Sequence, residues 1–265
     1  MKKPIGIFDS GLGGLTVFSE IRKLLPKEDL IYFGDTAHVP YGSKSKEVVT
    51  NYSLKIAEFL ANQNVKMIVV ACNTASAFAL GALQRHFKLP ISGVILPGAK
   101  SAVELSSRKR IGVIGTEGTI KSSSYDRAIR SLSKKAKILS APCPLFVPLI
   151  EEGWVSHPVT AAVAREYLTP LSRKGIDVMV LGCTHYPLIK KIIRAVVDRN
   201  ILLVDSAEAA AKDVAATLTQ KQLLQEKGPF GKYKFYVSDA PDKFKVLGKR
   251  FLGHSVENVK RVSLE

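Results

Sequence analysis

Two of the three cysteines occupy closely similar positions in the sequence. Cys72 follows the apolar run Met67–Val70 within the letters ACNTAS, and Cys183 follows Val178–Leu181 within GCTHYP. Both loops lead toward a helix-like pattern, and a helix N-terminus lowers the pKa of a thiol from about 8.5. A single cysteine is often an apolar side chain of the core, but two in matched polar loops indicate a pair of reactive thiols. Cys143, between two prolines, has no polar neighbour and is expected to be a core residue.

A pair of thiols suits a reaction that inverts a stereocentre. Racemisation takes a proton from one face of a carbon and returns one to the opposite face, so two similar acid–base groups must flank the substrate. One must be a thiolate while the other is a thiol, and neighbouring Asp9 and His185 could set these states through hydrogen bonds and charge. We therefore predict that Cys72 and Cys183 transfer protons at one α-carbon from opposite sides.

Other polar residues of the loops could stabilise the deprotonated substrate. The α-proton of an amino acid is weakly acidic, so the anion needs hydrogen-bond donors arranged around its carboxylate. Glycines at 11, 13 and 14 fit neither GxGxxG nor Walker A spacing, yet a glycine-rich turn at a helix start suits a carboxylate. The further candidate donors, from side chains or backbone N–H groups, are Ser10, Tyr41, Gly42, Asn73, Thr74 and Thr184.

The sequence gives no indication of a cofactor or a metal. No lysine lies in a pattern typical of pyridoxal phosphate attachment. Cys183 and His185 could contribute to a zinc site, but no CxxC pair or second cysteine–histidine pair completes the four ligands. We expect an enzyme that uses neither.

Strands and helices that alternate along the chain must position these loops. The strands expected from short β-rich apolar runs are Ile5–Phe8, Leu30–Phe33, Met67–Val70, Ile111–Ile114, Lys137–Leu139, Val178–Leu181, Leu202–Val204 and Tyr233–Val237. The helices expected from apolar residues at helical spacing are Leu15–Leu25, Lys46–Ala61, Ala75–His86, Ser123–Ser133, Val159–Leu171, Leu188–Val197, Ala207–Lys221 and Pro241–Phe251. This order predicts an α/β protein with a mainly parallel sheet, which binds its ligand where strands end and helices begin.

The repeated strand–cysteine–helix pattern indicates two similar lobes. We expect residues 1–97 and 206–265, from both chain ends, to form the first lobe and residues 98–205 to form the second. The boundary would lie near Pro97 and Gly98. The segment after Lys227 contains no recognisable catalytic group and is expected to pack beside the first lobe.

The chain is strongly basic, with a formal net charge of +16. The basic residues are spread through helix-like segments, which favours solvated helix faces over a nucleic-acid footprint. A nucleic-acid-associated binding role stays open as an alternative of a different class. The N-terminus lacks a secretory pattern, no apolar run reaches about 18 residues, and three cysteines cannot all pair. We expect a cytoplasmic protein that does not span a membrane.

Five segments, taken together, closely resemble the aspartate/glutamate racemase superfamily and, within it, the glutamate racemases. They are GIFDSGLGGLTV (6–17), YFGDT (32–36) with PYG (40–42), ACNTAS (71–76), GTEGTI (115–120) and LGCTHYPL (181–188). The resemblance implies cofactor-independent racemisation of L-glutamate to D-glutamate for bacterial peptidoglycan synthesis. It also implies two flavodoxin-like lobes that face each other across the active site, and a homodimer.

The same resemblance implies roles for individual residues. By position, Cys72 and Cys183 would transfer protons, with Asp9 assisting the first and His185 the second. Glu151 fits the family's additional carboxylate near the second cysteine, although adjacent Glu152 leaves that choice open. The enzymatic alternatives are a racemase of aspartate, a hydantoin or another small acid, and a hydrolase or decarboxylase that uses only one thiol.

Overall fold

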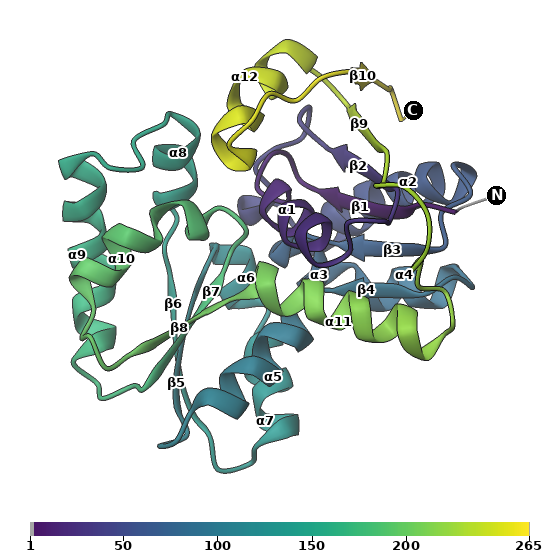
Figure 1. Cartoon of the computed structure of the whole chain (residues 1–265). Coiled ribbons are helices and arrows are strands. Elements are labelled where there is room, and N and C mark those ends of the chain that lie inside the picture. Colours follow the sequence, from purple (N-terminus) through teal and green to yellow (C-terminus); the bar gives the residue numbers. More distant parts are fainter. Residues whose placement is uncertain (1–2, 265) are drawn as a thin grey trace.

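A computed structural model describes residues 3–264 and shows two parallel β-sheets flanked by helices (Figure 1). The first sheet has the order β10-β9-β2-β1-β3-β4 and the second the order β6-β5-β7-β8. All neighbouring strands are parallel, which confirms the predicted fold class. The strands are β1 (Ile5–Asp9), β2 (Leu30–Gly34), β3 (Met67–Val70), β4 (Ile91–Gly93), β5 (Arg110–Gly115), β6 (Lys137–Pro142), β7 (Val178–Gly182), β8 (Leu202–Asp205), β9 (Tyr233–Val237) and β10 (Val259–Arg261).

Apart from Asp9 at the end of β1 and Arg110 at the start of β5, the central strands are apolar, as expected where helices cover both faces of each sheet. Ile7 and Phe8 of β1 point to opposite faces and belong to separate core clusters of the first sheet. The second sheet likewise has a core cluster on each face. In the register of the first sheet, Asp9 pairs with Gly34 and Phe8 with Val70, so β1, β2 and β3 end at the same edge. The loops that follow these strands are therefore neighbours.

The helices connect successive strands and differ in places from the prediction. The expected helix Ala75–His86 is two shorter helices, and the expected Leu188–Val197 is a 3₁₀ turn followed by an α-helix. The α-helices and 3₁₀ turns are α1 (Leu15–Leu24), η1 (Tyr41–Ser43), α2 (Lys46–Asn62), α3 (Asn73–Phe78), α4 (Leu80–His86), α5 (Ile95–Leu105), α6 (Glu117–Lys121), α7 (Ser124–Leu132), α8 (Phe146–Glu151), α9 (Pro158–Ser172), η2 (Tyr186–Ile189), α10 (Lys190–Val196), α11 (Ser206–Gln220) and α12 (Pro241–Leu252).

Helix α5 was not predicted because it contains Pro97 and Gly98, which suggested a lobe boundary. Its N-cap is Val94, so Pro97 lies in the first turn, where a backbone N–H has no acceptor within the helix and its loss is tolerated. The expected boundary therefore falls inside a continuous helix.

Helix α11 returns the chain from the second sheet to the first. It directly follows β8, the edge strand of the second sheet, but its alanine-rich face packs with α1 in a core cluster of the first sheet. Figure 1 shows α11 running from the second sheet along the lower side of the first, with the C-terminal α12 above the first sheet. Within residues 3–264, no helix has the length and apolar character needed to cross a membrane.

Candidate active site

The carboxyl ends of both sheets open onto one small cavity. Its volume is about 30 Å³, enough for one or two water molecules. The loops after β1, β2, β3, β5 and β7 all contribute to it, together with one residue of α8. The lining residues are Ser10, Val39, Pro40, Tyr41, Gly42, Cys72, Asn73, Thr74, Thr116, Val147, Cys183, Thr184 and His185. Most of the residues proposed from the sequence therefore meet here, and Asp9 and Glu151 lie directly behind them.

A wider pocket between the lobes borders this cavity. Its volume is about 340 Å³, and Pro40, Gly42, Thr116 and Val147 line both spaces. Glu151 also lines it. The pocket provides an approach to the cavity from the surface.

Cys72 lies between the end of β3 and the start of α3. Its sulfur accepts a hydrogen bond from the Ala75 backbone N–H at 3.4 Å, as the N-cap of α3, and donates to Ser10 Oγ at 3.7 Å. Burial raises the pKa of Cys72 to about 12, and the negative charge of Asp9 adds to this effect. The hydrogen bond from the helix N-terminus lowers the pKa of this thiol as expected, but burial and a nearby anion outweigh it, so the net shift is upward.

Asp9, at the end of β1, is completely buried. Its carboxylate accepts from the Gly11 backbone N–H at 3.0 Å, and Thr184 of the other lobe donates to it at 3.5 Å. Burial raises the pKa of Asp9, whereas the positive charge of His185 opposes that shift. Asp9 thus interacts by charge with groups of both cysteine loops.

Cys183 lies beside a cation. His185 Nδ1 is 3.8 Å from the Cys183 sulfur, and Nε2 is 3.1 Å from Glu151 Oε1. Burial alone would lower the pKa of His185, but hydrogen bonds and charges from Cys183 and Glu151 outweigh it and raise the pKa to about 10. At neutral pH the imidazolium then has the Cys183 sulfur on one side and Glu151 on the other. The carboxylate on His185 belongs to Glu151, while Glu152 lines the outer pocket.

The local backbone differs between the two cysteine loops. Cys72 directly precedes an α-helix, whereas Cys183 precedes a turn and the 3₁₀ segment η2. The expected position of Cys183 at the start of an α-helix is therefore not found. His185, two residues further on, supplies the positive charge in that loop instead.

Some of the proposed carboxylate donors are already paired. Thr74 Oγ1 shares hydrogen bonds with Thr116 and Thr119 at the start of α6, and the Tyr41 hydroxyl donates to Asp35. Asn73 is different, because its Oδ1 accepts from a tyrosine while its buried Nδ2 has no hydrogen-bond partner among residues 3–264. An unused amide donor at the cavity wall is suited to a carboxylate oxygen.

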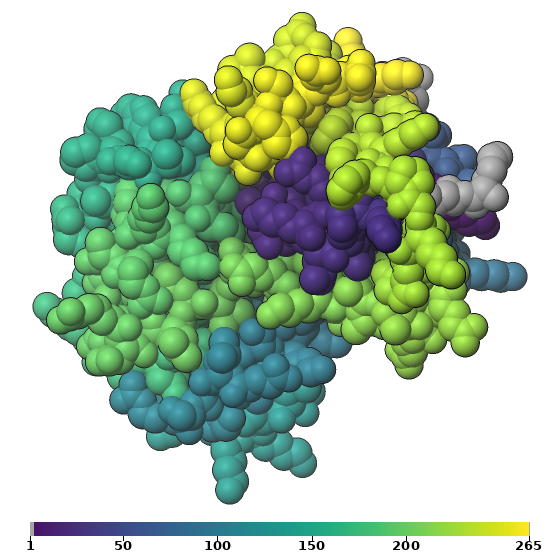
Figure 2. All heavy atoms as spheres, viewed as in Figure 1, coloured from purple at the N-terminus to yellow at the C-terminus, as the bar shows by residue number. Residues whose placement is uncertain are grey.

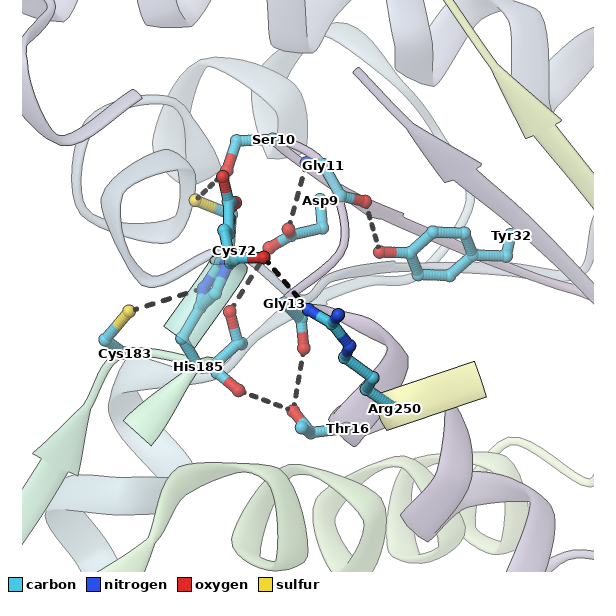
Figure 3. A network of polar contacts seen from close by, with 12 residues as sticks. Asp9, Ser10, Gly11, Gly13, Thr16, Tyr32, Cys72, Cys183, His185 and Arg250 are labelled. Carbon is cyan, nitrogen blue, oxygen red and sulfur yellow. Dashed lines mark hydrogen bonds and ion pairs between the residues drawn. The ribbon is translucent and has the colours of Figure 1, made fainter. Parts of the chain in front are cut away.

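The two lobes meet at the glycine-rich loop. A Cβ atom at Gly13 would lie 2.4 Å from both His185 Nδ1 and Thr184 Oγ1, so only glycine allows this approach. Thr16 strengthens the contact, since its hydroxyl donates to Gly13 O at 2.9 Å and to Thr184 O at 3.0 Å. Figure 3 shows these residues in one polar network with Cys72 and Cys183 on it.

Sequence reasoning missed several residues around the site. Thr116 and Val147 line the cavity, and Thr16 joins the lobes. Thr116 stands within a segment that carried the family resemblance, which was a usable signal. Arg250 and Phe251 of α12 also reach the site, although the C-terminal segment was expected only to pack beside the first lobe. No local sequence pattern indicated that Arg250 and Phe251 would reach the site.

Comparisons with known proteins show which family the chain is similar to. The model of the Asp/Glu/Hydantoin racemase family matches residues 5–214. A glutamate racemase of Geobacter metallireducens is 53% identical over 263 residues, which cover 99% of this chain and 97% of that protein. One from Neisseria gonorrhoeae is 46% identical, with coverage of 99% and 97%.

Solved structures give the same result. A glutamate racemase from Francisella tularensis in complex with D-glutamate has a TM-score of 0.93 and 40% identity, covering 100% of this chain and 98% of that one. A glutamate racemase isoform from Bacillus anthracis has a TM-score of 0.96 and 37% identity, with coverage of 99% and 98%. The chain belongs to the Asp/Glu/Hydantoin racemase family and is an isomerase.

Proposed function

We propose that this protein is a cofactor-independent glutamate racemase that interconverts L- and D-glutamate by two-cysteine proton transfer. The observation that carries the proposal is that Cys72 and Cys183, from different sheets, line the same cavity. Relatives at 46–53% identity are named glutamate racemases, and one similar structure contains D-glutamate. These findings support glutamate over aspartate as the substrate.

In the proposed reaction, the Cys183 thiolate takes the α-proton of one enantiomer. The electron pair of the broken C–H bond stays on the α-carbon and delocalises into the carboxylate. The thiol of Cys72 then gives its proton to the opposite face, which leaves Cys72 as a thiolate and Cys183 as a thiol. The reverse reaction restores both sulfurs. His185 and Glu151 would assist Cys183, and Asp9 would assist Cys72.

The substrate carboxylate would be held by the polar residues of the loops. The unpaired Nδ2 of Asn73 is the strongest candidate, because burial without a partner costs about 1–3 kcal/mol and a carboxylate oxygen would remove that penalty. Ser10, Thr74, Thr184 and the backbone of Tyr41 and Gly42 complete the proposed set. Each of them lines the cavity.

We also propose the lobe division 1–97 with 206–265, and 98–205. The membership of the strands supports it, since β1–β4, β9 and β10 form one sheet and β5–β8 the other. The packing of α11 against α1 supports the return near residue 206. In the cell, the proposed role is supply of D-glutamate for peptidoglycan, by a cytoplasmic homodimer.

The proposal is tested by incubating each glutamate enantiomer in deuterated water without added cofactor. We expect optical rotation to decay to zero while one α-deuterium enters each inverted molecule, because the proton that arrives comes from a solvent-exchanged thiol. L-Aspartate serves as the comparison substrate. Faster racemisation of aspartate, or release of ammonia or carbon dioxide, would contradict the proposal.

A further inference from the structure

Helix α12 belongs to the first lobe but touches the catalytic groups of the second. Phe244, Leu247 and Leu252 anchor it in a core cluster of the first sheet. Phe251 packs against this cluster and also against the core cluster of the second sheet that contains Cys183. Figure 2 shows the yellow C-terminal segment lying against the teal segment of the second lobe. One helix therefore spans the junction beside the site.

Arg250 holds the turn that carries Glu151. Its Nη1 donates to the Glu151 backbone carbonyl at 3.3 Å. The turn is shaped to receive it, because Gly153 has φ of +84° and a Cβ atom there would lie 2.5 Å from Arg250 Nη1. Figure 3 shows Arg250 joining the polar network from the yellow ribbon of α12. The guanidinium thus contacts the backbone from which Glu151 reaches His185.

Phe251 contacts His185 itself. The two ring centroids are 5.5 Å apart and the planes are at 85°, an edge-to-face arrangement. Such pairs contribute about 0.5–1.5 kcal/mol beyond burial and restrict the orientation of both rings. His185 Nδ1 faces Cys183 only in one ring orientation, so a fixed ring plane matters for the thiolate.

We propose that Arg250 and Phe251 are positioning residues that hold the Glu151–His185 pair against Cys183. The consequence is that Cys183 is prepared for proton transfer only when the first lobe, through α12, is docked on the second. Within residues 3–264, the hydrogen-bond partners of Cys72 are Ser10 and Ala75, and both are in its own lobe. The catalytic meaning of this inference rests on the proposed two-cysteine function.

The charged groups around His185 make the positioning effect of Arg250 and Phe251 measurable. Cys183 and Glu151 face the ring, Asp9 acts on it from β1, and Arg250 lies behind Glu151. Movement of Glu151 or rotation of the ring weakens the imidazolium–thiolate pair. The readout is therefore the reactivity of Cys183 relative to Cys72 in the same molecule.

The test uses the variants Arg250→Ala, Arg250→Lys, Phe251→Leu and Phe251→Tyr, with Lys249→Ala as the control. Lys249 is the exposed neighbour of Arg250 on α12 and carries the same charge. Alkylation of each cysteine by iodoacetamide at pH 8 is followed by mass spectrometry, and the His185 ring is titrated by ¹⁵N NMR. Thermal unfolding verifies that each variant is folded.

We expect Arg250→Ala to lower the Cys183-to-Cys72 alkylation ratio and kcat/KM about tenfold each, and Phe251→Leu to lower them about fivefold. Phe251→Tyr should keep most of both values because it retains the ring, and Arg250→Lys should retain part of them. Lys249→Ala should match the wild type. A change in cavity access affects both thiols and leaves the ratio unchanged.

Folded Arg250→Ala and Phe251→Leu variants with an unchanged alkylation ratio and unchanged His185 titration would overturn the inference. The alkylation ratio and the His185 titration are measured without turnover. They therefore distinguish failure of the positioning role from failure of the proposed function. If the wild type racemises no glutamate but the ratio still falls in Arg250→Ala, the positioning role stands and the proposed function fails. If racemisation is normal and the ratio does not move, the positioning role fails alone.

Discussion

The loops of Cys72 and Cys183 occupy equivalent places in two parallel sheets, but their electrostatic surroundings are opposite. The two cysteine residues are almost equally buried, with exposures of 6% and 5%. Cys72 has buried Asp9 as its charged neighbour and a pKa raised to about 12, first by burial and then by that charge. Cys183 has His185, whose own pKa is raised to about 10. One sulfur therefore rests as a thiol, and the other faces an imidazolium.

This difference shows how a duplicated arrangement can serve an asymmetric task. A two-base reaction needs one protonated and one deprotonated group at the start of each turnover. The parallel topology supplies two similar positions at the carboxyl ends of strands. The side chains around each sulfur then set its charge state. The position of each sulfur and its protonation state depend on different residues, so each can be tested separately.

The strongest test removes one sulfur at a time. Cys72→Ala and Cys183→Ala should each lower kcat/KM for glutamate by at least about 1,000-fold, because loss of either acid–base group stops inversion. Racemisation is measured by circular dichroism in both directions. Cys143→Ala is the control, since that buried thiol does not line the cavity. Near-normal turnover in either of the first two variants would mean that the two loops are not functional partners.

The next test separates the loops without changing a catalytic group. Gly13→Ala would place a Cβ atom 2.4 Å from His185 Nδ1, so the lobes must shift apart, and we expect kcat/KM to fall about 100-fold. Gly11→Ala is the matched variant in the same loop, because its Cβ would meet Val39 at an ordinary 3.4 Å. The fall in kcat/KM of Gly11→Ala should be much smaller than that of Gly13→Ala. Equal effects in the two variants would show that the close approach at Gly13 is unimportant.

The third test reduces the electrostatic difference itself. Glu151→Gln removes a hydrogen-bonded charge from His185, so the pKa of the imidazolium should fall from about 10 toward its ordinary value. The imidazolium is then lost at lower pH, and kcat/KM at pH 8 should fall about tenfold. A ¹⁵N NMR titration gives the pKa, and the pH profile should move to lower pH on its alkaline side. Glu152→Gln, next to it but exposed, should change neither value.

Much of the fold and the site followed from the sequence because the information is local. Buried strands such as Met67–Val70 are continuous apolar runs, and the residues directly after them must lie at the ligand-binding edge of a parallel sheet. The confirmed fold class and family rest on such segments. The edge strands β4 and β10 were missed because three residues are too few for a periodic pattern.

The remaining differences arise from tertiary contacts. The sequence places Cys72 at a helix start, but only the fold shows that the thiol is buried with Asp9 beside it, and burial first and that charge second reverse the expected pKa shift. Likewise, Arg250 lies 99 positions from Glu151, and no pattern around it predicts the contact. Long-range burial and charge decided these points, and neither is a property of a short segment.

The cavity between the sulfurs has a consequence for the timing of catalysis. About 30 Å³ is far below the roughly 300 Å³ of a ligand site, so we expect the cavity to open toward the bordering pocket of about 340 Å³ when an amino acid enters and again when it leaves. Opening motions of this kind take microseconds to milliseconds in proteins. We expect solvent viscosity, which slows such motion but not proton transfer, to set the upper limit of the rate.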